Sequence, residues 1–482
     1  SLARRGRSLQ ARALRVSERV RGTPGAGART VIRLDEEHLL IAGRIDAGHP
    51  EEALGTRILI VDGDGDERDV TDALHRYVDR RSARTGSSAS GYALLYRTRP
   101  GARPTAMKLR RADGRERSSA LPVPRAAPDA LGRVIRLLEL LADCAHGQRA
   151  LLDAVLGPAI ERTWNKREHC LRNAAPDSTE TPGSLDDGRR GADRVDHNRE
   201  LATAAPRVSV IVPLYGRHDF MAHQLVHFVS DPELREAEIL YVLDDPRLAG
   251  AVRRDAEALA RLHDIAFSVV YLPRNLGYAG ANNVAAAFAR GRSLLLLNSD
   301  VLPAAAGWLG EMLAVAEAGA GERLVGARLL YDDDSVQHDG MRFEQAANFE
   351  GLWINRHPGK GLPRDLFPVT AEAPVREAVT GACLLVGRRR YAELGGLDEG
   401  YVLGDFEDSD FCLKARRAGL DIRLASRAAL YHLERQSQSL VTAARWKRDL
   451  THYNCWRHSR LWHDDIVALQ GVARGDSAEE GS

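Results

Sequence analysis

The feature that most constrains the fold is a regular alternation of apolar runs and helical patterns that begins at Arg207. The apolar runs are VSVIVPL, EILYVLDD, AFSVVYLP and RSLLLLNSD, and YAGANNVAAAFARG before the last of them has the pattern of a helix ending at Gly291. Short apolar runs are typical of buried strands, and their alternation with helices predicts a mostly parallel sheet covered on both faces. In such sheets, ligands bind outside the carboxyl ends of the strands.

Each of the four predicted strands ends in polar or turn-forming residues. In chain order these are Pro213 and Tyr215, then Asp244 and Asp245, then Arg274 and Asn275, and finally Asn298, Ser299 and Asp300. Gly280 and Asn283 lie in the helical pattern after the third strand, where glycine lets a nucleotide approach the backbone closely. We expect these residues to meet at one edge of the sheet and to form a nucleotide site.

Asp300 closes a buried apolar run, which is a suitable place for a carboxylate that binds a hard cation. A Mg²⁺ or Mn²⁺ ion on a diphosphate takes only one or two protein carboxylates, because phosphate and water supply the remaining ligands. Taken alone, Asp300 is better explained as a turn or helix-capping acid before Pro303. The polar ends of the other strands shift the interpretation towards a metal ligand.

Two later segments carry further candidates. Glu407, Asp408 and Asp410 cluster at the start of a predicted helix, where acids also simply complement the helix dipole. Transfer of a group to a hydroxyl needs a carboxylate that takes the hydroxyl proton, and Glu407 and Asp408 are the candidates for such a base. His432 ends the predicted strand AALYH, and a neutral imidazole there would suit a metal site beside Asp300.

Eight motifs occur in an order that resembles the family-2 glycosyltransferases of GT-A fold, a Rossmann-like α/β class. They are VSVIVPLY, LDD, PRNLGYAGANN, LLLLNSD, TGACLLVGRR, GGLDEGY, EDSDFCLKARRAG and LYH, and they cover about residues 207–440. The segments SVQHDG and RHPGKGLPRD are similar to bacterial members that build O-antigen, capsule or other cell-surface polysaccharide.

The resemblance implies roles for the candidate residues. It implies that Asp300 is the metal-binding acid of the DxD motif and that His432 completes the metal site. It also implies that Asp408 is the base of an inverting transfer, that Asp244 and Asp245 bind the nucleoside, and that Gly381 and Ala382 line the donor site. Three positions depart from the pattern: Asn298 replaces the first DxD acid, LDDPRL replaces the common DDGS, and Gly216 replaces an asparagine.

The rest of the chain divides by composition. We expect a basic flexible arm over residues 1–30, a β-sandwich-like domain over 31–126, a helical connector over 127–170 and a linker over 171–206, before the GT-A domain at 207–440 and a C-terminal helix and tail at 441–482. The β-rich segment and the helices after it also resemble, more loosely, an extension found before some such domains. DGDGDERD at 62–69 is similar to a calcium loop, but Glu67 stands where an EF-hand needs glycine, so a tight turn is the better interpretation.

Composition excludes several classes of protein. The formal net charge of +1 gives no overall attraction to nucleic acid or anionic lipid. The five scattered cysteines argue against a disulfide framework and against a zinc site, and they fit a reducing compartment. The arginines of the N-terminus precede no apolar stretch, so they do not form a secretory signal, and no apolar run approaches the ~18 residues that span a bilayer. We therefore expect a cytoplasmic protein.

The predicted activity is a metal-dependent, inverting transfer of a sugar from a nucleoside-diphosphate sugar to a glycan or lipid-linked acceptor. Two alternatives stay open, a sugar-nucleotide pyrophosphorylase and a non-catalytic glycan-binding or scaffold protein. The C-terminal segment places Trp446, Leu450, Tyr453 and Leu461 near one helical face. Packing on the transferase is the favoured role of this face; peripheral contact with the inner face of the membrane, self-association and partner proteins are the alternatives.

Overall fold

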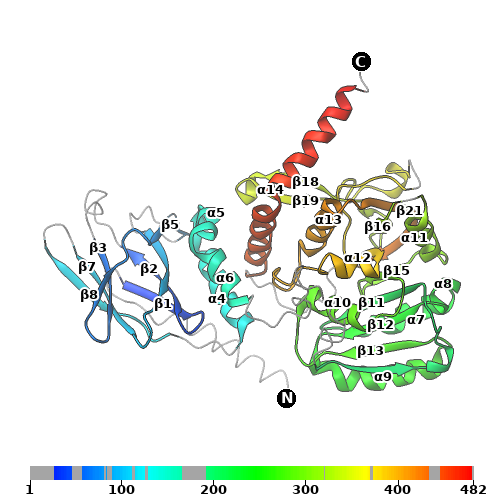
Figure 1. Ribbon diagram of the computed structural model, residues 1–482, viewed down its shortest axis with the longest axis horizontal. Coiled ribbons are helices and arrows are strands. Elements are labelled where there is room, and N and C mark those ends of the chain that lie inside the picture. The colour runs from blue at the N-terminus through cyan, green and yellow to red at the C-terminus, as the bar shows by residue number, and fades with distance from the viewer. Residues whose placement is uncertain are drawn as a thin grey trace, which may run out of the picture. The chain divides into compact units, whose positions relative to one another are not determined.

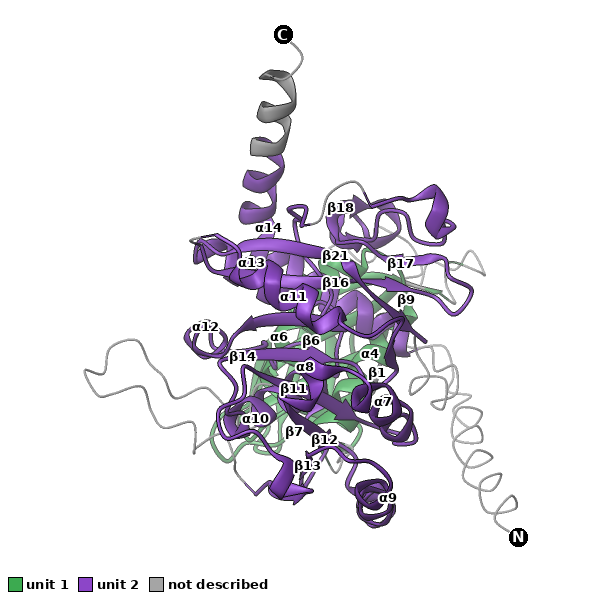
Figure 2. Ribbon diagram, turned by 90° about the vertical axis from the view of Figure 1, so that its right-hand side faces the viewer, with its two compact units in different colours: residues 1–163 green, residues 164–482 purple. Residues whose placement is uncertain are grey.

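The computed structural model describes residues 27–45, 57–80, 83, 90–110, 114–124, 129–164, 191–319, 321–369, 373–433 and 446–479. The chain divides into two compact units, residues 1–163 and 164–482, which Figure 2 shows in different colours. Residues 1–26 of the predicted basic arm and most of the predicted linker lie outside the described residues, whereas residues 27–30 of the arm belong to a strand and not to a flexible segment. Among the described residues, no helix combines the length and the apolar character needed to cross a membrane.

The first unit holds two antiparallel sheets. Their orders are β1-β2-β6-β5-β9 and β4-β3-β7-β8. The strands are β1 (Gly27–Arg33), β2 (His38–Ile45), β3 (Arg57–Asp62), β4 (Glu67–Asp69), β5 (His75–Asp79), β6 (Ser90–Arg97), β7 (Pro104–Arg110), β8 (Glu116–Ala120) and β9 (Cys144–His146). Side chains of both sheets, including Ile41, Ile60 and Tyr92, share one buried core, as in a sandwich. The acidic segment between β3 and β4 is a tight turn with Gly65 at φ +88°, as the sequence predicted.

Helices follow the sandwich, as expected. They are α4 (Ala130–Asp143), α5 (Gln148–Leu151), a π-helical turn η1 (Leu152–Leu156) and α6 (Gly157–Trp164). Asp129 begins α4 by accepting a hydrogen bond from the Gly132 N–H. Gly157 and Pro158 follow the π-helical turn directly and begin α6, where proline is tolerated because a first helical turn lacks a partner for its N–H.

The second unit is built on one large mixed sheet with the order β10-β13-β12-β11-β14-β20-β16-β21-β15. Its central strands β13, β12, β11 and β14 are parallel, as predicted. The strands are β10 (Asp193–His197), β11 (Val208–Leu214), β12 (Glu238–Leu243), β13 (Phe267–Tyr271), β14 (Ser293–Leu297), β15 (Val301–Pro303), β16 (Arg323–Leu330), β20 (Cys383–Gly387) and β21 (Asp421–His432). Short β17 (Val336–His338) pairs with β16, and β18 (Arg342–Ala346) forms a hairpin with β19 (Leu352–Arg356).

Two hydrophobic cores cover the two faces of this sheet. Alternate residues of β11 point to opposite faces, so that Val210 and Val212 enter one core and Ile211 enters the other. The first core contains α7 (Phe220–Val229), α9 (Ala249–Leu262) and α11 (Trp308–Glu317), with short α8 (Pro232–Arg235) beside them. The second contains α10 (Gly277–Phe288), α12 (Arg388–Glu393), α13 (Glu407–Arg417) and α14 (Trp446–Glu479) (Figure 1). Helices therefore cover both faces of the sheet, as the sequence predicted.

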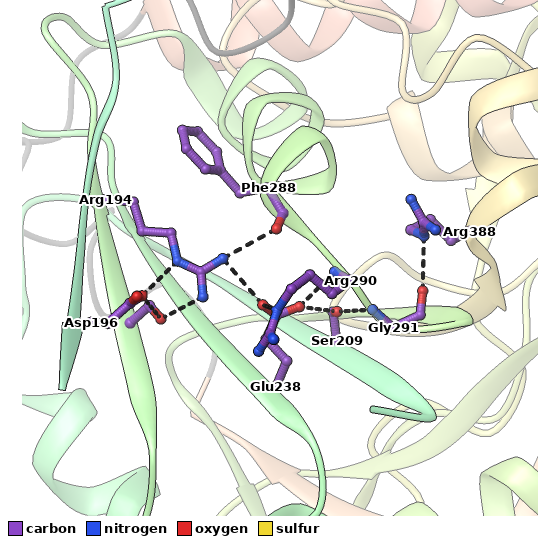
Figure 3. Close-up of polar contacts among 9 residues, drawn as sticks. Arg194, Asp196, Ser209, Glu238, Phe288, Arg290, Gly291 and Arg388 are labelled. Atoms are coloured by element: carbon purple, nitrogen blue, oxygen red, sulfur yellow. Dashed lines mark hydrogen bonds and ion pairs between the residues drawn. The ribbon is translucent and has the colours of Figure 1, made fainter. Parts of the chain in front are cut away.

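The edge strand β10 lies inside the segment that the sequence predicted to be a linker. It pairs antiparallel with β13, and a polar network fixes it to the sheet (Figure 3). The buried Glu238 carboxylate accepts hydrogen bonds from Arg194 at 3.1 Å, Arg290 at 2.8 Å and the Ser209 hydroxyl at 2.6 Å. This network occupies the amino ends of the parallel strands, which leaves their carboxyl ends to form a site.

Candidate functional site

Strand register brings Asp300 and His432 together. β15 pairs antiparallel with β21 so that Val301 lies opposite His432, and the Leu433 N–H donates to the Asp300 carbonyl at 3.0 Å. Asp300 Oδ1 consequently lies 3.3 Å from His432 Nε2, with about a tenth of each side chain exposed (10% and 12%). The two residues that the sequence predicted as metal ligands are therefore neighbours.

Gln337 fixes the orientation of the His432 ring. Its amide Nε2 donates to the His432 carbonyl at 2.9 Å, which leaves its Oε1 to accept from His432 Nδ1 at 2.6 Å. With Nδ1 facing this amide oxygen, Nε2 faces the Asp300 carboxylate and lies 3.4 Å from the side-chain amide nitrogen of Asn298. A metal-bound histidine usually has its second ring nitrogen on an oxygen acceptor, and the Gln337 amide oxygen fills that place here.

The electron-rich Asp300 oxygen and His432 nitrogen fit a divalent cation. Two electron-rich atoms 3.3 Å apart repel each other unless a proton or a cation lies between them. Among the described residues, no group of three or more acid, histidine or cysteine side chains forms a closed metal cage. An ion here would take most of its ligands from elsewhere, as Mg²⁺ and Mn²⁺ do when they bind a diphosphate.

Asp408 lies near the start of α13 and is held by backbone N–H groups. Its Oδ2 accepts from the Gly381 N–H at 3.0 Å and its Oδ1 from the Ser409 N–H at 2.7 Å. Burial raises the pKa of Asp408, and these hydrogen bonds partly oppose that effect. Burial and the neighbouring Asp408 charge raise the pKa of Glu407 well above its ordinary value. The proton of the pair therefore belongs on Glu407 and the negative charge on Asp408.

The segment Thr380–Ala382 connects the Asp300 end of the site to Asp408. The Asn298 N–H donates to the Ala382 carbonyl at 3.0 Å, while Gly381 contacts Asp408 as described. A Cβ atom on Gly381 would lie 3.2 Å from the Asp408 Cβ and 3.1 Å from the Tyr278 hydroxyl, so the position has little room for a side chain. Three of the predicted site segments therefore meet at the carboxyl edge of the sheet.

Asp244 and Asp245 both have structural partners. Asp244 accepts hydrogen bonds from the Leu276 and Gly277 N–H groups at 2.6 and 2.9 Å, which anchors the start of α10. Asp245 forms a two-point ion pair with Arg247, with both distances 2.7 Å, and this pairing lowers the pKa of its carboxyl. A contact of either acid with a nucleoside stays a prediction.

The structure changes the interpretation of two residues of α10. The Asn283 amide donates to Leu397 and Glu399 and accepts from the Tyr391 hydroxyl and the Leu397 N–H. These four hydrogen bonds occupy both the donors and the acceptor of the amide, so Asn283 holds the GGLDEGY segment, and its contact with a nucleotide stays a prediction. Gly280 is equally internal, since a Cβ there would lie 2.7 Å from the Leu276 Cβ.

The remaining predicted residues lie nearer the surface. Tyr215 is 38% exposed and Arg274 is exposed, whereas Pro213, Asn275 and Ser299 are half-buried. Asn275 accepts from the Gly277 N–H at 2.8 Å, so it too supports the start of α10. Their contact with a ligand stays a prediction.

Four residues of the site were not singled out from the sequence. Gln337 orients His432, and the Tyr278 hydroxyl donates to the Gly381 carbonyl at 2.6 Å. The buried His338 accepts from the Thr380 N–H at 3.3 Å. Gln337 and His338 belong to the SVQHDG motif, and Thr380 belongs to TGACLLV. The motifs therefore marked these segments, but the residues that they contact are remote in sequence and could not be predicted.

Part of the second unit matches a known protein family. Residues 209–370 match the family model described as Glycosyl transferase family 2. The "Uncharacterized protein y4gI" of Sinorhizobium fredii is 36% identical over 168 residues, which cover 34% of this chain and 18% of that protein. The "O-antigen biosynthesis protein RfbC" of Myxococcus xanthus is 28% identical over 255 residues, covering 50% of this chain and 18% of that protein.

This chain spans less than a fifth of the length of either relative. Among solved structures, GalNAc-T7 with UDP, GalNAc and Mn²⁺ matches with a TM-score of 0.38 and 16% identity, covering 48% of this chain and 44% of that one. A similarity this weak carries no weight for the family or the fold, which are given by the family match and by the strand order of the sheet. The second unit of the chain therefore contains a family 2 glycosyltransferase domain of the GT-A fold.

Proposed function

We propose that this chain transfers a sugar from a nucleoside-diphosphate sugar to a hydroxyl of a glycan or lipid-linked glycan, with inversion at the anomeric carbon. The observation that carries the proposal is the convergence of Asp300, His432 and Asp408 on one sheet edge, joined through Asn298 and the Thr380–Ala382 segment. The likeness to a protein named for O-antigen biosynthesis supports bacterial surface polysaccharide as the product.

Asp300 and His432 would hold the divalent cation of such a reaction, Mn²⁺ or Mg²⁺. A cation bound there supplies positive charge that stabilises the charge developing on the departing nucleoside diphosphate. The protein's own contribution is to orient the two ligands. Gln337 fixes the orientation of the His432 ring, and strand pairing fixes the separation of His432 from Asp300.

Asp408 would take the proton of the acceptor hydroxyl. Its carboxylate is anchored by the Gly381 and Ser409 N–H groups, and burial raises its pKa towards the range in which a carboxylate works as a general base. The neighbouring Glu407 stays protonated, so one negative charge rather than two faces the acceptor. Direct displacement with a single base gives inversion.

The base is tested by Asp408→Asn, assayed with a panel of nucleoside-diphosphate sugars and mass spectrometry of the products. Asparagine keeps the shape but cannot accept the proton, so we expect transfer to fall by about 10²–10⁴-fold. Asp465→Asn is the control, because Asp465 pairs with Arg417 on the surface. A folded Asp408→Asn protein that transfers sugar near the wild-type rate would remove Asp408 from the mechanism.

The metal ligands are tested by binding, independently of turnover. Calorimetry with a nucleoside diphosphate, with and without Mn²⁺, should show metal-enhanced binding in the wild type. In Asp300→Asn and His432→Phe the enhancement should fall by about 10-fold or more, because each variant removes one of the two protein ligands. Equal enhancement in the variants would show that the cation binds elsewhere.

A further inference from the structure

The segment immediately before Glu407 has an unusual backbone. Leu403, Asp405 and Phe406 have φ values of 63°, 77° and 75°, and Gly404 between them has φ 149°. Side chains rarely adopt this left-handed region, because Cβ crowds the following carbonyl. Three such residues in four positions persist only where surrounding contacts impose the conformation, and such segments cluster at functional sites.

Asn454 of α14 imposes this conformation. Its buried side chain accepts from the Val402 N–H at 3.1 Å and donates to the carbonyls of Val402 and Gly404, at 3.2 and 2.5 Å. One amide thus satisfies three backbone groups of the segment. An asparagine is suited to this task, since it offers both an acceptor and two donors.

The same face of α14 continues the contact along the segment. The Thr451 hydroxyl donates to the Asp405 carboxylate at 2.8 Å, and His458 lies against Phe406 and within 3.2 Å of the Ser409 hydroxyl. Trp462 donates to the Asp410 carboxylate at 2.7 Å. Positions 451, 454, 458 and 462 are spaced by three or four residues, so they form one stripe on the helix.

The segment is also fixed from the opposite direction. The Tyr278 N–H donates to the Leu403 carbonyl at 3.2 Å, and a Cβ on Gly277 would lie only 3.3 Å from the Leu403 Cα. The Tyr278 hydroxyl reaches the Gly381 carbonyl, and the Gly381 N–H holds Asp408. Residues 402–406 are therefore packed between α10 and α14, and their path sets where α13 begins and where Asp408 points.

We propose that Asn454 is a positioning residue for Asp408, acting through the left-handed segment 402–406. This inference rests on the proposed function, because it assigns Asp408 as the base. It makes α14, which lies outside the residues 209–370 matched to the family, part of the catalytic apparatus. Asn454 itself touches neither substrate nor cation.

The test compares Asn454→Ala and Asn454→Asp with Ser459→Ala. Alanine removes all three hydrogen bonds, and aspartate keeps the acceptor but turns a negative oxygen towards two carbonyls. Ser459→Ala removes from the same helix the hydroxyl that accepts from the buried Trp353 N–H and that also bonds Cys455, and both of these partners lie outside residues 402–410. Thr451→Val is a milder variant for use where the Asn454 variants do not fold.

We expect both Asn454 variants to lower kcat by about 10- to 100-fold, the usual effect of misplacing a reacting group by about 1 Å. The affinity for a nucleoside diphosphate should stay within about twofold of wild type, because the residues proposed to bind the donor lie elsewhere. The acid limb of the kcat–pH profile should move, because the environment of Asp408 changes. Loss of folded protein alone would lower the apparent rate without moving the limb. Thr451→Val should show the same pattern with about a threefold effect.

The outcomes separate the two proposals. Suppose that the wild-type chain transfers sugar and that the Asn454 variants and Ser459→Ala have the same kcat and the same pH profile. This result leaves the proposed function in place and overturns the role of Asn454. Equal loss of donor affinity and kcat in the Asn454 variants also overturns it, since it indicates general disruption. A wild-type chain that transfers no sugar from any donor overturns the proposed function, and the positioning role falls with it.

Discussion

At the scale of single residues, the paired acids Glu407 and Asp408 divide their tasks by environment. Both are sheltered from solvent, but backbone N–H groups stabilise the charge on Asp408, whereas one Glu407 oxygen, Oε2, is buried without a hydrogen-bond partner in the described structure. A protonated carboxyl tolerates such a place far better than a carboxylate does. The protonation of the pair is thus set by hydrogen bonding more than by residue type.

Glu407→Gln should stabilise the protein increasingly as pH rises. Burial and the Asp408 charge raise the pKa of Glu407 in the folded state, so the folded chain binds its proton more tightly than the unfolded chain. The resulting stability is full below the ordinary glutamate pKa and is lost as pH rises through the folded pKa, by up to about 1.4 kcal/mol per pH unit. Glutamine does not titrate and avoids this loss.

Urea unfolding of Glu407→Gln and wild type at about pH 5 and about pH 8 checks this sign. The exposed Glu311→Gln serves as the matched control and should follow the wild type at both pH values. A stability difference between Glu407→Gln and wild type that is the same at both pH values would show that folding does not raise the pKa of Glu407.

The sequence predicted which residues end the strands but not all of their partners. Asp300, Asp408 and His432 were identified because position relative to a strand or helix end is local information. The partners of Asn283 were not predicted, because Leu397 lies 114 positions further along the chain. Hydrogen-bond partners this far apart depend on how the helices and strands pack. Local sequence patterns, which span only a few residues, do not predict that packing.

At the scale of elements, the sheet extends beyond its predicted start. The β10 sequence DRVDH is short and polar, so it lacks the apolar run that identified the other strands. Its place in the sheet depends on the Arg194–Glu238 ion pair and on pairing with β13. The C-terminal helix was predicted, but Leu461 is 42% exposed while Leu450 and Tyr453 are buried, so one residue of the expected face was wrong.

Glu238→Ala should detach β10 and lower the free energy of unfolding by about 3–5 kcal/mol, because it leaves the cations of Arg194 and Arg290 without their shared carboxylate. The surface pair Arg207–Glu317 provides the control, and Glu317→Ala should cost less than about 1 kcal/mol. Denaturant unfolding measures both. A Glu238→Ala protein as stable as Glu317→Ala would show that β10 contributes little to the fold.

At the scale of the whole molecule, the sandwich of residues 1–163 and the sheet of residues 164–482 have separate hydrophobic cores. A unit with its own core unfolds cooperatively by itself. Calorimetry of the full chain should therefore show two transitions. A nucleoside diphosphate with Mn²⁺ should raise only one of them, since ligand binding stabilises the unit that binds by about 2.7 kcal/mol at a concentration 100 times Kd. Asp300→Asn should abolish most of that shift and leave the other transition in place. If the chain instead showed a single transition that the ligand raised as a whole, the two units would unfold as one, and the sandwich would have to be counted with the catalytic domain.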